Sequence, residues 1–338
     1  MRRAAVASLL VAIVACGTKP PPPPPAPPPA PLHLEPACDL VPAAGLEWIV
    51  EAKPRAIAEV PDLIPAIGLV IPEERFRMFT AAHGGIDLRQ IQDLCVAHYR
   101  DALLTVARTP IDPIKVEKAF TDRSTRSPLR TFVLPNPPVF RLSGEVNGEA
   151  QQIILFGRDA VVLEEGRAGP IRAAEAFALG KLRRALPALR GAALRPAAEA
   201  LGDAPVRVFA PGPFEGASAQ GLGGLLRATT AIGASAKPLE KGRIGVRVVL
   251  TGAWGDDAPA AGERLAAAVH VVAESSVGRL FGLDKPIDGA PVVHHQRDAL
   301  VLEMTLDGMT LARGAHDALD AEVTDILRGR QEPKKPSP

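Results

Sequence analysis

Aromatic residues are scarce in this chain of 338 residues, and neither sign of charge dominates it. Phe, Trp and Tyr make up 4% of the sequence, so it supplies few rings for the stacking platforms that bind sugars or single-stranded bases. Lys and Arg number 39 against 38 Asp and Glu, so there is no basic surplus of the kind that nucleic-acid-binding domains carry. The composition therefore argues against a lectin and predicts no nucleic-acid partner.

Motifs of catalysis and metal binding are also missing. The sequence has no H-E-x-x-H and no G-x-x-x-x-G-K-[ST], and the stretch GASAQG around Ser218 lacks the second glycine of G-x-S-x-G. His294 and His295 are adjacent, but neighbouring strand residues point to opposite faces, so the two do not easily share one ion. We therefore predict no catalytic residue, no metal site and no cofactor, and an enzyme is the less favoured class.

Two pairs of residues have a functional interpretation beside a structural one. Ser235 and Lys237 would share one face of a strand, where a Ser–Lys pair can be nucleophilic in principle; we favour a strand edge that meets a loop. Arg123 and Arg126, in the sequence DRSTRS, could bind an anion; we favour a solvated loop.

The first 17 residues have the pattern of a lipoprotein signal. Arg2 and Arg3 precede an apolar run that has about half the length needed to span a membrane. The run ends in IVACG at residues 13–17, which resembles the lipobox of bacterial lipoproteins. The resemblance implies cleavage after Ala15, diacylation of the Cys16 sulfur and acylation of the new amino terminus, which gives three acyl chains. An ordinary signal peptide with a chance cysteine is the alternative.

An acylated Cys16 would make membrane lipid the first partner of the protein, since three acyl chains exceed the two signals that stable anchoring needs. Gly17 follows the cysteine in place of Asp, which by the same resemblance favours the outer membrane, with the protein facing the periplasm. Ten of the twelve residues 20–31 are proline. Such a run favours a polyproline II stalk of roughly 37 Å; a ligand for a proline-binding module is the alternative.

The three cysteines fit an oxidising compartment. If Cys16 carries lipid, Cys38 and Cys95 remain for one disulfide. Closing a loop of about 57 residues would stabilise the fold by at most about 4 kcal/mol in the chain-entropy model.

Alternating apolar patterns predict strands that are mostly joined as hairpins, for example over 93–108 and on both sides of Asn147-Gly148. Helices are expected in six stretches: 54–83, 111–122, 171–201 with breaks at Pro187 and Pro196, a Gly-rich piece over 214–226, one from a cap at Asp257 to about 282 with Leu265, Val269 and Val272 facing the core, and 309–327. The predicted fold class is α+β, with antiparallel sheets and packed helices.

Three Arg-Asp-Ala steps, beginning at Arg100, Arg158 and Arg297, stand between strand-like stretches, so we expect a turn at each. The sequences RDAVVLE and RDALVLE each close the last hairpin of one half of the chain. Both halves follow the order strand, helix, hairpin, helix, hairpin, helix, which suggests two diverged structural repeats. His98 and His295 precede two of the steps by two residues, and Phe156 takes that place before the third, which indicates packing.

The expected organisation has five parts: a signal peptide over 1–15, the lipidated cysteine and proline-rich linker over 16–37, α+β halves over 38–184 and 185–330, and a disordered tail over 331–338. The lipobox, the stalk and the Ala/Arg/Pro-rich body together resemble uncharacterised lipoproteins of GC-rich bacteria such as the myxobacteria, a resemblance that brings no known activity.

The function we expect is a non-catalytic binding or interaction role in the envelope, with a protein partner there. One alternative is a periplasmic carrier or sensor of an apolar ligand held between the two halves, which would show a mostly apolar cavity of a few hundred Å³. The other is an envelope hydrolase with an unrecognised site.

Overall fold

The computed structural model describes residues 31–167, 169–182 and 184–327, with side chains up to residue 319. The lipobox with Ala15 and Cys16, the stalk up to residue 30 and the tail over 331–338 lie outside the described residues. Among the described residues, no helix is long and apolar enough to cross a membrane.

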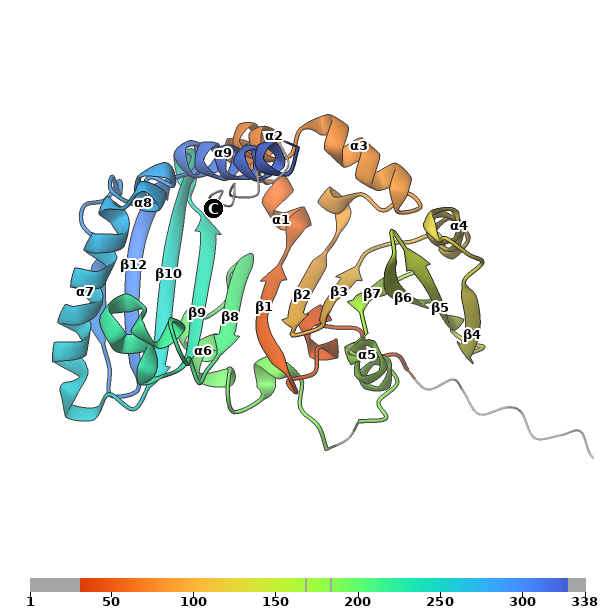
Figure 1. The fold of residues 1–338 in the computed structure, drawn as a ribbon, viewed down its shortest axis with the longest axis horizontal. Helices are drawn as coiled ribbons and strands as arrows, with labels where there is room; N and C mark the ends of the chain where they lie inside the picture. The colour runs from red at the N-terminus through yellow and green to blue at the C-terminus, as the bar shows by residue number, and fades with distance from the viewer. Residues whose placement is uncertain (1–30, 168, 183, 328–338) are drawn as a thin grey trace, which may run out of the picture. The chain divides into compact units, whose positions relative to one another are not determined.

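Twelve strands of the described chain form one antiparallel sheet (Figure 1). Their order across the sheet is β11-β12-β10-β9-β8-β1-β2-β3-β7-β6-β5-β4. Their bounds are β1 Leu46–Ala52, β2 Asp93–Tyr99, β3 Ala102–Arg108, β4 Leu129–Leu134, β5 Val139–Val146, β6 Glu149–Phe156, β7 Ala160–Gly166, β8 Val206–Pro211, β9 Thr229–Pro238, β10 Arg243–Gly252, β11 Val292–His295 and β12 Ala299–Asp307. The predicted α+β class with an antiparallel sheet is confirmed.

Helices cover both faces of this sheet. The α-helices are α1 Pro54–Ala58, α2 Ile64–Val70, α3 Glu73–Ala82, α4 Pro113–Arg123, α5 Pro170–Ala178, α6 Arg195–Leu201, α7 Ala258–Glu274, α8 Ser276–Leu280 and α9 Gly308–Leu327. Short 3₁₀ helices lie between them: η1 Ala37–Leu40, η2 Pro61–Leu63, η3 Leu88–Gln90, η4 Ala188–Arg190, η5 Ser218–Gln220, η6 Leu222–Arg227, η7 Glu240–Gly242 and η8 Gly255–Asp257.

Neighbouring strand residues belong to different cores, as the alternation of side chains along a strand requires. Ile154 packs in a core that η1, α5 and α6 cover, whereas Ile153 packs on the other face under α4. In the second half, Val249 belongs to the first of these cores and Leu250 packs under α7. The α4 core and the α7 core therefore lie on the same face of the sheet, in different halves of the chain.

Cys38 and Cys95 are joined by a disulfide bond, as the sequence predicts, with their Cα atoms 5.2 Å apart. Both cysteines are buried. Cys38 belongs to η1 and Cys95 to β2, so the bond ties the segment before the first strand to the middle of the sheet.

All three Arg-Asp-Ala steps lie at turns between paired strands, which confirms the predicted turns. Two of the turns accept equivalent backbone hydrogen bonds from the end of a neighbouring strand. The Asp159 carbonyl accepts from the Thr109 N–H just after β3, and the Asp298 carbonyl accepts from the Gly252 N–H at the end of β10, both at 2.9 Å. The two halves share this local arrangement; their origin by duplication stays a proposal.

Several predicted helices differ from the structure, each for a local reason. The helix expected over 171–201 stops at Ala178, and Pro196 lies in the first turn of α6, where a missing N–H costs nothing, so it begins a helix instead of breaking one. Gly223 and Gly224 adopt positive φ, so the stretch over 214–226 forms only 3₁₀ turns.

The long helix of the second half is shorter than expected. Asp257 makes no capping hydrogen bond through its side chain. The helix ends at Glu274, and the next residue, Ser275, caps α8: its hydroxyl accepts from the Gly278 N–H. Val272, expected in the core, is 42% exposed.

Candidate ligand-binding site

A cavity of about 280 Å³ lies between the sheet and the two helices α3 and α4. Its walls are mostly apolar. Phe79 of α3, Val116 and Phe120 of α4, and the Ile86–Ile91 segment line it on the helical side, and side chains of β2, β3, β6 and β7 form its floor. The cavity is therefore built by the first half of the chain alone, and not between the two halves as the apolar-ligand hypothesis expected.

The floor of the cavity is less covered than the opposite face of the same strands. On β7, Val162 and Glu164 are fully buried under α5, whereas Val161, Leu163 and Glu165 are only half-buried. The same alternation occurs on β2 and on β3 up to Val106, whereas Ala107 and Ile153 of the cavity floor are buried. The half-buried side chains of β2, β3 and β7 agree with a covering layer that leaves space over these strands.

The positions of α3 and α4 depend on local sequence. Asp112 caps α4: its carboxylate accepts from the Ile114 N–H at 3.1 Å, and Pro113 fills the first turn. Gly84, just after α3, has φ +67° and crosses α4 so closely that a Cβ would lie 2.6 Å from the backbone of Lys115. Any other residue there would be strained and would push the two helices apart.

Four polar side chains interrupt the apolar lining: His83, Thr105, Arg123 and Glu165. The His83 ring stacks on Phe79 with centroids 4.0 Å apart, and its Nδ1 lies 2.9 Å from the Phe79 carbonyl. A carbonyl only accepts, so Nδ1 carries the hydrogen in neutral His83. Its Nε2 is then an acceptor, 3.4 Å from Nη1 of Arg123.

Burial governs the electrostatics of this group. It lowers the pKa of His83, and the nearby Arg123 cation lowers it further against the opposing hydrogen bond to Phe79. Burial also lowers the pKa of the Arg123 guanidinium, although the Glu165 carboxylate acts in the opposite direction. His83 is therefore held neutral and Arg123 is an incompletely solvated cation.

Arg123 has no carboxylate partner within ion-pair distance among the described side chains. Its Nε donates to the Ala119 carbonyl at 3.3 Å, one turn earlier in α4. Glu165 instead accepts from the Gln151 amide at 3.1 Å. The guanidinium thus keeps donors free for an anion at the edge of an apolar cavity.

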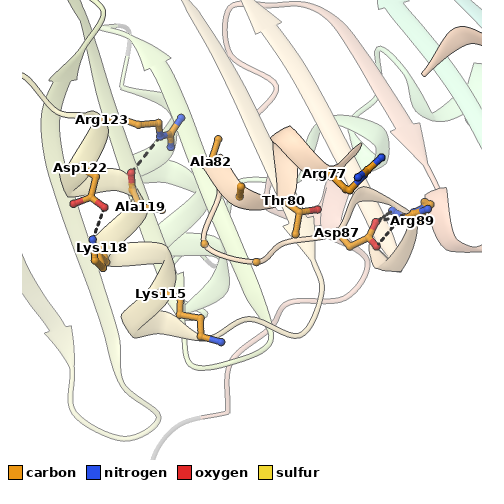
Figure 2. Close-up of a pocket in the computed structure, with 13 residues that line it drawn as sticks. Arg77, Thr80, Ala82, Asp87, Arg89, Lys115, Lys118, Ala119, Asp122 and Arg123 are labelled. Atoms are coloured by element: carbon orange, nitrogen blue, oxygen red, sulfur yellow. Dashed lines mark hydrogen bonds and ion pairs between the residues drawn. The ribbon is translucent and has the colours of Figure 1, made fainter. Parts of the chain in front are cut away.

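Arg123 also borders a wider depression of about 640 Å³ on the outer sides of α3 and α4. Figure 2 shows Lys115, Lys118 and Arg123 along α4 on one side of it, and Arg77 of α3 on the other. Five basic side chains line the depression, compared with only two carboxylates, those of Asp87 and Asp122.

Salt bridges within the depression leave two of its basic side chains without a carboxylate partner. Arg89 binds Asp87 at 3.0 Å, and Lys118 binds Asp122 at 2.6 Å. Lys115 lies 3.8 Å from Asp112. Within the part of the chain that the structure describes, Arg77 and Arg123 thus remain as the cations available to an incoming anion.

Other residues singled out in the sequence do not gather at this site. Arg126 is exposed and lines neither space. Ser235 and Lys237 line a separate cavity of about 430 Å³ under β9 and β10, and no hydrogen bond joins their side chains. His294 and His295 lie on β11, and His294 is 3.9 Å from Glu303.

Two of the cavity's polar residues, His83 and Glu165, gave no signal in the sequence. They lie 40 and 42 positions from Arg123 along the chain, and only the folded sheet brings the three together. Among the described residues, no group of three or more His, Cys, Asp or Glu side chains is placed to hold a metal ion.

No family model matches this chain, and no curated protein matches it. A solved structure described as "Structure of crystal form IV of TP0453" is similar at 8% identity with a TM-score of 0.46. The match covers 79% of this chain and 92% of that chain. A likeness of this size does not decide the function.

Proposed function

We propose that this protein is a non-catalytic, lipid-anchored binding protein of the bacterial envelope that takes up a small apolar ligand between α3, α4 and the sheet. The observation that supports the proposal is the cavity of about 280 Å³ with a mostly apolar lining. Apolar cavities of about 150 Å³ already bind benzene, and ligand pockets begin at about 300 Å³. The proposed anchor is acylated Cys16, which would hold the protein at the outer membrane, facing the periplasm.

The few polar groups in the cavity fit binding better than catalysis. Thr105 is the one hydroxyl among the cavity-lining residues, and no hydrogen bond joins it to His83. His83 accepts from Arg123 and donates to a backbone carbonyl, so its two nitrogens are occupied by positioning bonds. A hydrolase would need a nucleophile bonded to a base in the cleft.

The test uses the mature, lipidated protein in nanodiscs of phosphatidylcholine and the neutral probe N-phenyl-1-naphthylamine, which fluoresces in apolar surroundings. We expect saturable binding by the wild type. Val161→Phe should abolish it, because the larger ring fills the cavity above β7. The same variant should gain about 0.5–2 kcal/mol of stability, as cavity-filling substitutions commonly do.

Val271→Phe is the matched control, because Val271 is 70% exposed on α7 and far in sequence from the cavity. It adds the same ring and should leave probe binding unchanged. Probe bound equally by wild type and Val161→Phe, after subtraction of empty nanodiscs, would refute the proposal. A stoichiometric envelope protein captured by crosslinking in cells, together with no probe binding, would favour the protein-partner hypothesis instead.

A further inference from the structure

The apolar cavity and the basic depression meet at one side chain. Among the residues that the structure describes, Arg123 alone lines both. The inner sides of α3 and α4 supply Phe79, Val116 and Phe120 to the cavity, and their outer sides supply Thr80, Lys115 and Lys118 to the depression. A ligand whose apolar part fills the cavity would therefore have its other end at the Arg123 guanidinium.

We propose that the ligand is a single-chain anionic amphiphile, with its chain in the cavity and its carboxylate or phosphate head on Arg123. This inference rests on the proposed function and adds the chemical class of the ligand. The cavity volume lies at the lower limit of ligand pockets, so it suits one chain and not the two chains of a membrane phospholipid.

The charge of the head group follows from the groups around Arg123. The guanidinium has free donors, and planar guanidinium groups bind carboxylates and phosphates through two parallel hydrogen bonds. Arg77, across the depression, is also without a carboxylate partner among the described residues. Together they place positive potential where the head group would lie.

Glu165 is the one carboxylate in the cavity lining and opposes an anionic ligand. Its side chain already accepts from Gln151, and it forms no ion pair with Arg123. His83 adds no positive charge, because it is held neutral beside Arg123. The preference for an anion therefore depends on Arg123 and is open to direct test.

The experiment measures displacement of N-phenyl-1-naphthylamine from the lipidated protein in phosphatidylcholine nanodiscs at pH 8. The competitors share a ten-carbon chain and differ in the head: decanoate, decyl phosphate, decanol and decyltrimethylammonium. We expect decanoate to displace the probe at about tenfold lower concentration than decanol, because its carboxylate can form charge-assisted hydrogen bonds with the Arg123 guanidinium; tenfold corresponds to about 1.4 kcal/mol. The comparison of decanoate with decyl phosphate separates the two sources of the anionic head.

Arg123→Gln should remove the preference for decanoate, so that decanoate and decanol displace the probe at similar concentrations. Arg123→Lys, which keeps the charge but loses the planar fork, should retain part of the preference. Arg126→Gln is the matched control, because Arg126 lies three positions further on, is exposed and borders neither space. Circular dichroism of each variant verifies that it is folded.

Equal displacement by decanoate and decanol on the wild type would overturn the inference and leave the proposed function intact. Tightest displacement by decyltrimethylammonium would also overturn it and would assign the head group to Glu165. Loss of the decanoate preference in Arg126→Gln as well as in Arg123→Gln would mean that surface charge in general, and not Arg123, sets the preference. Absence of probe binding altogether would instead refute the proposed function.

Discussion

Among single residues, His83 makes the candidate site sensitive to pH, because its ring lies between Phe79 and the Arg123 cation. Its pKa in the folded protein is below its ordinary value of 6.5, chiefly through burial. The other charged groups that face the cavity are Arg123 and Glu165, on α4 and β7. A proton on His83 would bring a second positive charge beside Arg123.

The stability of the protein in mild acid should depend on His83. Because the folded pKa of His83 is lowered, the unfolded chain takes up a proton near pH 6.5 while the folded chain does not. The contribution of His83 to the free energy of unfolding is thus fully present above pH 6.5 and is lost as the pH falls toward the pKa of His83 in the folded protein. We expect the free energy of unfolding to fall below pH 6.5 in the wild type and to fall less in His83→Gln.

Urea unfolding between pH 8 and 5 measures this difference, and NMR titration of the His83 ring measures the pKa directly. His98→Gln is the control, since His98 stacks on Trp48 and binds Glu47 outside the cavity. A ring pKa of His83 at or above 6.5 would contradict the prediction.

The sequence named one residue of this site, Arg123, but favoured a structural interpretation of it over a binding role. Arg123 was considered as an anion ligand because it stands in a polar stretch, and that stretch equally fits a solvated loop. Its special situation arises from the residues around it. His83, just after α3, and Glu165, on β7, line the same cavity as Arg123, and no local pattern in the sequence brings the three together. Arg126, indistinguishable from Arg123 in sequence, is exposed.

Among the secondary-structure elements, α5 depends on a buried carboxylate of the neighbouring strand. The Glu164 side chain is fully buried, and its two oxygens accept from the N–H groups of Gly169 at 3.2 Å and Ile171 at 2.7 Å. These N–H groups belong to the first turn of α5, where the helix itself offers no acceptor. Burial raises the pKa of Glu164 against these bonds.

We predict that Glu164→Ala lowers the free energy of unfolding by about 2–4 kcal/mol, because it leaves the buried Ile171 N–H and the partly buried Gly169 N–H without acceptors. Glu303→Ala is the matched control. Glu303 has the same place in RDALVLE that Glu164 has in RDAVVLE, but its side chain is 46% exposed and its contact with Arg247 is 3.4 Å. It should cost less than about 1 kcal/mol. Equal losses in urea unfolding would disprove the role of Glu164 as the cap of α5.

Strands were more predictable than helices because their signals are more local here. β2 and β3 coincide with the hairpin predicted over 93–108, and the turn at Asn147-Gly148 has positive φ at both positions, as such a turn requires. Helix ends depended on details that periodicity does not contain, such as the cap at Ser275. The edge strand β4 was not predicted, because its sequence LRTFVL does not alternate between apolar and polar residues.

In the described sheet, the order of five strands is the same on both sides of the boundary between β1 and β8, and β5 and β4 extend the first half beyond them. A hairpin follows each of these two strands, β2 with β3 and β9 with β10, and the strand after an Arg-Asp-Ala step, β7 or β12, pairs with the second strand of that hairpin. This order supports the proposed duplication. The halves nevertheless differ where the candidate site lies, because in the second half Trp254 and Leu225 pack on α7 in the corresponding core.

The proposed anchor and the cavity belong to separate parts of the chain, so a substitution at the anchor should leave ligand binding unchanged. The cavity is built from residues between 79 and 165, whereas the proposed lipid attachment is at Cys16. Cys16→Ala should therefore abolish incorporation of labelled palmitate and release the protein from membranes in fractionated cells. Its affinity for N-phenyl-1-naphthylamine should not change.

Cys38→Ala is the control for this variant, because it removes a thiol of the disulfide and leaves the lipobox intact. It should still incorporate palmitate, although it loses a bond that contributes at most about 4 kcal/mol. Palmitate incorporated by Cys16→Ala would refute the anchor. Release from the membrane together with loss of probe binding would mean that binding requires the bilayer, and that the apolar ligand reaches the cavity from the membrane.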